Sequence, residues 1–378
     1  MFRRKAMLTT LALAAMALAA CSDKEGTTPA IETGGEIQTT VEEKIIIDQA
    51  GTEVTIPGEV NSIVSGGILP YFHTWYVATN SAKEIVGMHP NSYNAAENSI
   101  LAKMAPEILN ADTSFVKNGE MNVEELLNIK PDVYFELSTD EKSIEATRKA
   151  GINTVAIKAI DAAAAEPLAT FNSWLQLTGE IANTTDRADK FIEVGTAVQE
   201  EIYEKIGDLT KEQKPNALMM YQLSEQAITV GGKNFFGNQW LNATGANDVA
   251  EDEVTGRKDI NMEQIYEWNP DIIYLTNFTP IQPEDLYNNT IPGQDWSGVD
   301  AVKNKQVYKI PLGIYRWFPP SGDAPLMLKW LANNNQPELF NYDMNAEIKS
   351  YYKDFYDFNV TDEEVEQILH PSSDAAKY

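Results

Sequence analysis

The chain has 378 residues, and its 56 acidic side chains outnumber 29 basic ones, which gives a formal net charge of −27 at pH 7. Such an acidic chain repels nucleic acid and anionic membrane surfaces, so we expect neither as a direct partner. The length exceeds the size at which a single core stops growing, which predicts two domains. The one cysteine, Cys21, excludes an internal disulfide.

The first 20 residues have the order of a secretory signal peptide. Arg3, Arg4 and Lys5 precede an apolar stretch at 6–20, shorter than the roughly 20 residues that a comfortable membrane-spanning helix needs. The stretch ends in Leu-Ala-Ala-Cys, which resembles the bacterial lipobox. We therefore expect cleavage before Cys21 and lipid attached to that cysteine. The alternative is an ordinary secretory signal or a buried segment, followed by an accidental cysteine.

Residues 21–43 follow, rich in Thr, Gly and Glu with little apolar periodicity, which is typical of a flexible tether. Removal of residues 1–20 takes away three cations and no acid, so the charge moves from −27 to −30. The protein is therefore expected outside the cytoplasm, attached to the membrane through its lipid.

An internal repeat divides the rest of the chain. Residues 121–135 align without a gap to residues 260–274, so the two copies start 139 positions apart. Asn, Glu, Pro and Asp coincide in the two segments, and apolar positions fall opposite apolar positions. This recurrence indicates two similar structural units.

Each copy predicts one helix that begins at an asparagine. Asn122 and Asn261 are good N-caps, and Glu125 and Gln264 follow three positions later, as in a capping box. A proline-aspartate pair then ends each helix. Short apolar strands of the kind buried in parallel sheets follow at 133–137 and 272–275.

The same alternation of strand and helix extends on both sides of the repeat. Further strands are predicted at 61–65, 84–87, 154–157, 217–221 and 306–310. Further helices are predicted at 69–79, 143–150, 239–243 and 324–331. Strands that alternate with helices indicate an α/β fold with mainly parallel sheets.

We therefore predict two Rossmann-like α/β lobes, at 44–165 and 211–335. The segment between them, 166–210, is periodic in Leu, Ile, Phe, Ala and Val, which predicts a long helical connection in two pieces. Residues 336–378 are predicted to form a helical tail. A helical connection resists bending, so large closure of the lobes is not expected.

Several short segments, taken in order and spacing, resemble one known family. They are 55–57, 84–87, both Glu-containing Pro-Asp repeats, 241–250, 301–308, 330–332, 337–340 and 355–358. The chain resembles the periplasmic binding proteins that serve iron-siderophore, haem and cobalamin importers, the class with a rigid helix between its lobes. The resemblance covers nearly the whole mature chain, although no single segment is diagnostic.

The resemblance implies that ligand binds in a cleft between the lobes, and that one exposed glutamate per lobe meets arginines of a permease. The matching positions are Glu124 and Glu263. At a helix start each carboxylate also stabilises its helix by about 0.3–1 kcal/mol, which is the alternative role. The implied partner is an ABC permease dimer with cytoplasmic ATPases, and the chain itself is expected to be a monomer without nucleotide or cofactor.

Aromatic and imidazole side chains follow the first two predicted strands, where they suit a planar chelate or an aromatic siderophore. The candidates are Tyr71, His73, His89 and Tyr93. The alternative is a helix start with core aromatics, which claims Phe72, Tyr76 and at least one of these histidines.

The second lobe offers Tyr315, Arg316 and Trp317 after the strand at 306–310. Arg316 can pair with anionic oxygen, and its aromatic neighbours can stack on a conjugated ligand. The alternative is a proline-rich turn packed by its own aromatics. Trp240 is a further candidate of the same kind.

We therefore expect a substrate-binding lipoprotein of an ABC importer that captures an iron complex, such as a siderophore chelate, or a related metal complex. Cobalamin, haem or a molybdate-type oxyanion is the alternative ligand, and an oxyanion could use Arg316 and backbone N–H groups. A metal-dependent enzyme is a further alternative. The sequence has no Gly-x-Ser-x-Gly, phosphate-loop or His-Glu-x-x-His motif, and three histidines leave little room for a zinc site or a catalytic triad.

Overall fold

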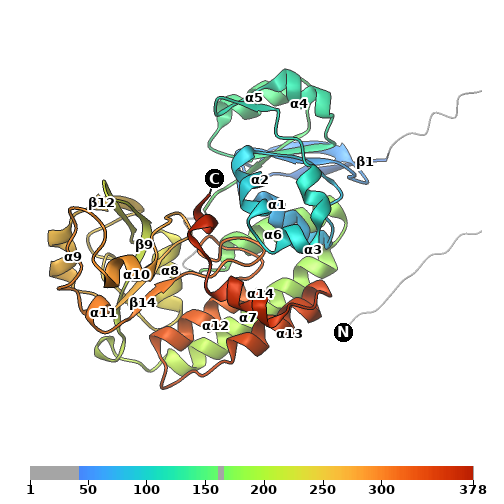
Figure 1. Ribbon diagram of the computed structural model, residues 1–378. Coiled ribbons are helices and arrows are strands. Elements are labelled where there is room, and N and C mark those ends of the chain that lie inside the picture. Colours follow the sequence, from blue (N-terminus) through green and yellow to red (C-terminus); the bar gives the residue numbers. More distant parts are fainter. Residues whose placement is uncertain (1–41, 161–165, 378) are drawn as a thin grey trace, which may run out of the picture. The chain divides into compact units, whose positions relative to one another are not determined.

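The computed structural model describes residues 42–160 and 166–377 (Figure 1). The predicted signal peptide, Cys21 and nearly all of the predicted tether lie outside the described residues. The described chain begins with β1, Glu43–Ile47, which pairs antiparallel with β2, Glu53–Pro57. Residues 55–57, expected before the first strand, therefore belong to a strand themselves. Val54 and Ile56 of β2 are buried while Glu53 and Thr55 are exposed, the alternation of a strand with one covered face.

A four-stranded parallel sheet organises the N-terminal lobe, in the order β4-β3-β7-β8. Its strands are β3 Ile63–Ser65, β4 Ile85–Met88, β7 Val133–Leu137 and β8 Thr154–Ile157. All four are predicted from the sequence. Their side chains are almost entirely buried, which explains why the strands read as continuous apolar runs.

Helices and one small hairpin connect these strands. They are α1 Tyr71–Thr79, α2 Pro90–Glu97, α3 Leu101–Met104, η1 Pro106–Asn110, the hairpin of β5 Val116–Lys117 with β6 Glu120–Met121, α4 Val123–Ile129 and α5 Glu141–Lys149. Helix α1 is buried on nearly every side, because it packs against the connecting helix α6.

The sheet of the C-terminal lobe is mixed, in the order β12-β10-β9-β13-β14 with β11 beside β9. Parallel pairing joins β9 Asn216–Leu223, β11 Asn247–Asp248, β13 Ile272–Leu275 and β14 Val307–Lys309. The antiparallel strands are β10 Ile228–Gly231 and β12 Arg257–Ile260. The sequence pattern does not predict these two, because the exposed, charged start of β12 lacks an apolar run. The helices of this lobe are α8 Phe236–Ala243, α9 Met262–Trp268, α10 Pro283–Tyr287 and α11 Asp300–Lys303.

The internal repeat forms α4 and α9, as predicted. The Asn122 side chain accepts hydrogen bonds from two backbone N–H groups of the first turn, and Asn261 accepts one. The Glu125 carboxylate, expected to complete a capping box, instead pairs with Lys117 Nζ at 2.6 Å. Each helix ends at a left-handed residue before its proline, Lys130 (φ 57°) and Asn269 (φ 38°).

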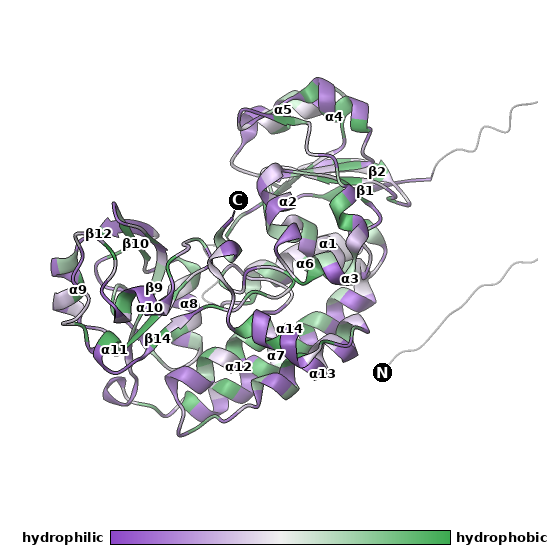
Figure 2. Cartoon of the chain, in the orientation of Figure 1, coloured by the Kyte–Doolittle hydropathy of each residue, from purple (hydrophilic) through white to green (hydrophobic). Residues whose placement is uncertain are grey.

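The connection between the lobes is helical and comes in two pieces, α6 Ala169–Ala182 and α7 Thr185–Ile206. Helix α7 has 22 residues and is therefore about 33 Å long. It packs against α6 and α12, and Figure 2 shows green and purple alternating along these helices, as expected of amphipathic elements. The fold is thus two α/β lobes joined by a helical connection.

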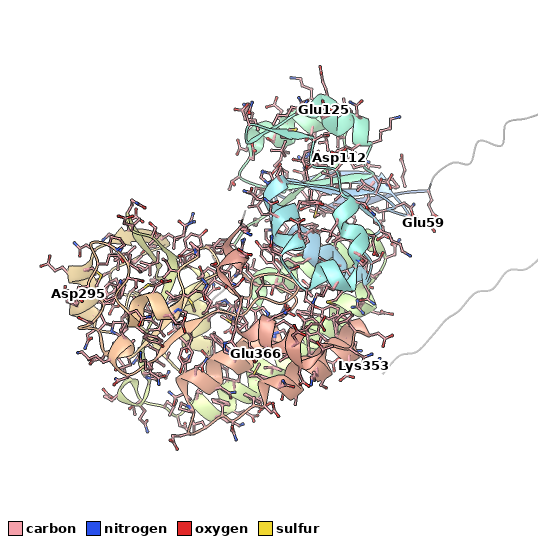
Figure 3. The ribbon with its side chains drawn as sticks, viewed as in Figure 1. Glu59, Asp112, Glu125, Asp295, Lys353 and Glu366 are labelled. Carbon is pink, nitrogen blue, oxygen red and sulfur yellow. The ribbon has the colours of Figure 1, made fainter. Side chains whose placement is uncertain are left out.

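Three helices and a short helical turn complete the part of the chain that the structure describes. They are α12 Ala324–Asn335, α13 Met344–Tyr356, α14 Asp362–Leu369 and η3 Ser373–Ala376. Charged side chains such as Glu59, Asp295 and Lys353 project outward from the ribbon (Figure 3), in keeping with the acidic composition. Within the described ranges, no helix combines the length and apolar character needed to cross a membrane.

Candidate functional site

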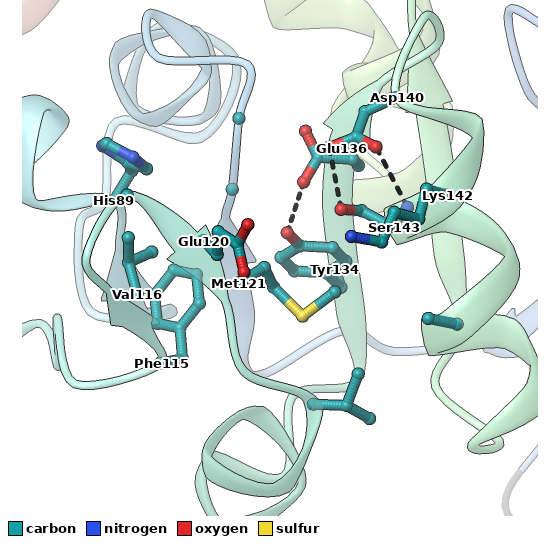
Figure 4. A pocket seen from close by; sticks show the side chains of 15 residues that line it. His89, Phe115, Val116, Glu120, Met121, Tyr134, Glu136, Asp140, Lys142 and Ser143 are labelled. Carbon is teal, nitrogen blue, oxygen red and sulfur yellow. Dashed lines mark hydrogen bonds between the residues drawn. The ribbon is translucent and has the colours of Figure 1, made fainter.

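A pocket of about 330 Å³ lies at the carboxyl ends of β3, β4 and β7 (Figure 4). Gly66 and Gly67 follow β3, His89 follows β4, and Glu136 lies near the end of β7. The β5-β6 hairpin and the start of α5 supply the remaining walls. Ligands of open α/β sheets commonly bind at this edge, because the loops that follow parallel strands meet there.

A hydrogen-bonded pair, Tyr134 and Glu136, forms the polar centre of the pocket. The two side chains are two positions apart in β7 and so share one face of the sheet. The Tyr134 hydroxyl donates to Glu136 Oε2 at 2.5 Å, and the Leu137 N–H donates to Oε1 at 2.7 Å. Glu136 is only 2% exposed, and burial raises the pKa of its carboxyl, while these hydrogen bonds partly oppose the rise.

Glycines make room for this pair. A Cβ at Gly67 would stand 2.1 Å from Glu136 Oε1, and one at Gly66 would stand 2.2 Å from the Tyr134 hydroxyl. Both separations are far below a normal van der Waals contact. The two glycines therefore let the β3-α1 loop approach the carboxylate closely.

We expect Gly67→Ala to displace the Glu136 carboxylate, which two hydrogen bonds fix in place, and to lower the free energy of unfolding by about 1–3 kcal/mol. Ligand affinity should fall with it. Thermal denaturation and ligand titration check both effects. Gly298→Ala is the matched control, because its Cβ would meet nothing closer than 3.5 Å. Equal changes in stability and ligand affinity in the two variants would contradict the close approach of the β3-α1 loop to the Glu136 carboxylate.

The pocket carries more negative than positive charge. Three carboxylates line it, Glu120, Glu136 and Asp140, against the single ammonium of Lys142. Asp140 is already engaged as the N-cap of α5, where it accepts from the Ser143 N–H at 3.0 Å. The excess of carboxylates favours a ligand with a positive centre or several hydrogen-bond donors.

His89 is the one predicted ligand residue that the structure brings to this pocket. Its Nδ1 accepts a hydrogen bond from the Asn91 N–H at 3.1 Å and so caps α2, which leaves the proton of the neutral ring on Nε2. Partial burial lowers the pKa of His89, which favours the neutral ring. Across 42–160 and 166–377, no group of three or more His, Cys, Asp or Glu side chains is arranged to hold a metal ion.

The other predicted ligand residues of the first lobe lie in or against the core. Tyr71 has no exposed surface and shares a hydrogen bond of 2.7 Å with Thr178. His73 is equally buried, its ring stacks on Tyr315 at 4.7 Å, and burial lowers its pKa to about 3. The partly buried Tyr93 donates to a backbone carbonyl of η1. Ligand contact by these three residues stays a prediction, and it would require neighbouring side chains to move.

The predicted residues of the second lobe are also buried. Trp240 and Trp317 have no exposed surface, and Trp240 Nε1 donates to the Phe318 carbonyl at 2.8 Å. Tyr315 is 3% exposed and also contacts the ring of Phe72. Their aromatic surfaces join the two lobes to the connecting helices in one apolar cluster. Direct contact with a ligand stays a prediction for all three.

Arg316 is 1% exposed, and its guanidinium lies 4.8 Å from the centre of the Phe278 ring. Nearby, the buried carboxylate of Asp323 accepts a hydrogen bond from the Ile314 N–H at 2.9 Å and fixes the loop that carries Arg316. Burial raises the pKa of Asp323 to about 7. A Cβ at Gly313 would stand 2.0 Å from this carboxylate, so the loop requires glycine there.

Residues 81–312 match the sequence model of a protein family described as periplasmic binding protein. The chain is 26% identical over 333 residues to the molybdate-binding protein MolA of Haemophilus influenzae, covering 83% of this chain and 91% of MolA. The structure of MolA bound to molybdate has a TM-score of 0.70, at 24% identity over 84% of this chain and 99% of that chain.

Two further solved structures are similar along most of their length. A periplasmic solute-binding protein from Veillonella parvula has a TM-score of 0.78 and 34% identity, covering 87% of this chain and 97% of that chain. Helicobacter pylori CeuE in a nickel-histidine complex has a TM-score of 0.63 and 26% identity, covering 87% of this chain and 99% of that chain.

Proposed function

This chain belongs to the periplasmic binding protein family, and from that premise we propose that its ligand is a small metal chelate of the iron-siderophore class, held beside Glu136. As a family member it is the extracytoplasmic substrate-binding component of an ABC transporter, working with a permease and its ATPase, and it is not an enzyme. The observation that carries the ligand proposal is the buried, hydrogen-bonded carboxylate in the pocket.

The negative charge of the pocket distinguishes between classes of ligand. Two unit charges 4 Å apart interact by about 4 kcal/mol near a protein surface, so a dianion placed beside Glu136 would be repelled strongly. A chelate without net negative charge, such as a ferric trihydroxamate, would escape this repulsion, and donor groups facing the pocket would be attracted. A ferric tris-catecholate is itself an anion and would be repelled as molybdate is. The volume of about 330 Å³ is at the small end of the usual range of about 300–1,000 Å³. Size therefore favours a small chelate over haem or cobalamin.

A molybdate-type oxyanion is the second candidate. The similarity to MolA supports it, and so does the donor fork of Arg316, which suits paired anionic oxygens. The carboxylates of the pocket oppose it. An oxyanion therefore requires a place in which Arg316 and backbone N–H groups outweigh Glu136.

Isothermal titration calorimetry with a panel of ligands tests the proposed function. The panel contains ferric catecholate and hydroxamate chelates, nickel-histidine, haem, cobalamin and molybdate. We expect one small chelate to bind with one-to-one stoichiometry and no turnover, and to bind more tightly than molybdate. Tight binding of molybdate alone, or consumption of more than one equivalent of any chelate, would contradict the proposal.

The lipid anchor is a separate proposal, which rests on the lipobox-like sequence before Cys21. We expect Cys21→Ser to release the protein from the membrane fraction, because one acyl chain binds a membrane only marginally whereas several attach it stably. Fractionation of cells and mass analysis of the mature N-terminus measure this. Ser22→Ala is the matched control. A mature N-terminus at another residue, without lipid, would rule the anchor out.

Docking to the permease through Glu124 and Glu263 is likewise proposed. Both side chains are exposed, and both hold the second position of their helices. The equivalence of α4 and α9 supports a partner with two similar subunits. Neither carboxylate is needed to complete its cap, because the asparagine before it accepts the N-terminal hydrogen bonds.

A further inference from the structure

Residues 371–377 fold back onto the loop that carries Arg316. The Arg316 Nε and Nη2 groups donate to the Ala375 carbonyl at 3.3 and 3.1 Å, and Nη2 donates to the Lys377 carbonyl at 3.1 Å. Just before this segment, the Leu312 N–H donates to the Ile368 carbonyl at 2.9 Å. The segment is thus seated on the side of the loop from which the guanidinium projects.

The two carbonyls accept hydrogen bonds from the N–H groups of Arg316, the groups through which a guanidinium binds anions. Guanidinium presents its N–H groups in a planar fork that matches the paired oxygens of a carboxylate or an oxyanion. Here the fork of Arg316 holds two backbone oxygens from one short segment. A guanidinium with 1% exposure needs such acceptors, because a buried charge without hydrogen bonds is costly.

The attachment of the segment is otherwise slight. Its side chains are exposed except at Pro371, Ala375 and the half-buried Ala376. Its surface ion pair joins Lys377 to Asp374, with both side chains about 60% exposed, and such pairs add little stability. Segments with few buried apolar contacts open locally more readily than the core does.

We infer that Arg316 is an anion subsite whose place the carbonyls of residues 371–377 occupy, and that an anionic group binds there when the segment is displaced. The inference rests on the proposed function as a ligand-binding protein and adds to it a subsite of opposite charge to the pocket beside Glu136. The ligand class is an oxyanion or the anionic arm of a chelate. The segment then competes with that group and sets the affinity for it.

Ala375→Trp in the full chain tests this competition, because Ala375 is 6% exposed and a tryptophan cannot fit in its place. Ser373→Trp is the matched control, since it adds the same side chain at an exposed position of the segment. With molybdate as the probe, Ala375→Trp should bind at least about tenfold more tightly than the unaltered protein and the control, because binding no longer displaces the segment. Adding Arg316→Gln to the Ala375→Trp variant should abolish this increase in affinity for molybdate.

Hydrogen exchange on the unaltered protein provides a second measurement that does not depend on variants folding. Saturating molybdate should speed exchange of the Lys377 amide, which donates to the Asp374 carbonyl at the end of η3. The inference is overturned if molybdate leaves the exchange rate of the Lys377 amide unchanged, or if Ala375→Trp does not increase the affinity for molybdate. It is also overturned if that affinity stays increased when Arg316→Gln is added. The metal chelates, titrated in parallel, test the proposed function separately: if a chelate binds every variant while molybdate affinity never changes, the subsite is wrong and the function stands.

Discussion

Reversing both docking charges, Glu124→Arg with Glu263→Arg, should reduce ligand import by about tenfold or more and leave ligand affinity nearly unchanged. The new arginines would face cationic side chains of the permease, and like charges at an interface repel. Each reversal removes a favourable interaction of about 0.3–1 kcal/mol with the helix dipole and adds an unfavourable one of similar size, so the free energy of unfolding should fall by no more than about 4 kcal/mol. Uptake of radiolabelled ligand by cells, calorimetry and thermal denaturation measure the three quantities.

The control is Glu145→Arg with Glu267→Arg, which makes the same change in net charge at exposed positions of α5 and α9. Cells that carry this control variant should import the ligand at the normal rate. The docking proposal is wrong if the test pair also imports normally, if both pairs fail equally, or if raising the ligand concentration restores import. A loss of stability well beyond about 4 kcal/mol would assign the glutamates to helix stability instead.

Glu136→Gln should weaken binding of the metal chelate by about tenfold to a hundredfold, the loss expected when a hydrogen bond to a charged group becomes a neutral one. Glutamine keeps the size of the side chain and can still bond to the Tyr134 hydroxyl. Glu120→Gln, at an exposed position of the same pocket, is the control and should change affinity little. If the ligand at this position were an oxyanion, Glu136→Gln would tighten binding.

The pH dependence of chelate affinity tests the same role of Glu136, because its direction depends on the charge of the carboxyl group. Because burial raises the pKa of Glu136, affinity for a positive centre should increase as pH rises through that raised pKa. The variant should lack this increase. Stability changes in the opposite direction: a carboxyl with a raised pKa binds its proton more tightly in the folded state, so its contribution decreases as pH rises from the unfolded value to the folded one.

Much of the fold could be predicted because its signals are local. The caps Asn122 and Asn261 bond within their own first turns, so a few residues specify the starts of α4 and α9. The buried strands β3, β7 and β13 appear as short apolar runs. Strands β1 and β12 could not be found in this way, because one carries exposed isoleucines and the other charged residues, and their pairing depends on neighbours in the folded sheet.

The site was predicted less well, since its contacts join distant parts of the chain. His89 reaches the pocket because loops after adjacent parallel strands must meet. Two signals for the rest were present in the sequence: Gly66 and Gly67 directly after a predicted strand, and the carboxylate of Glu136 within an apolar one. The aromatic residues Trp240 and Trp317 gave no indication of whether they face a cleft or the core. The partner carbonyl of Arg316 lies 59 residues further along the chain, beyond the reach of any local pattern.

Anomalous diffraction from crystals grown with the chelate that binds in calorimetry would show whether the ligand lies beside Glu136, because it locates the metal without assumptions about the ligand. We expect one strong peak inside the pocket lined by Gly67, Tyr134 and Glu136, with the organic part of the chelate against the same walls. A fully occupied metal outside that pocket, with the Glu136 carboxylate contacting no part of the ligand, would contradict the proposed site.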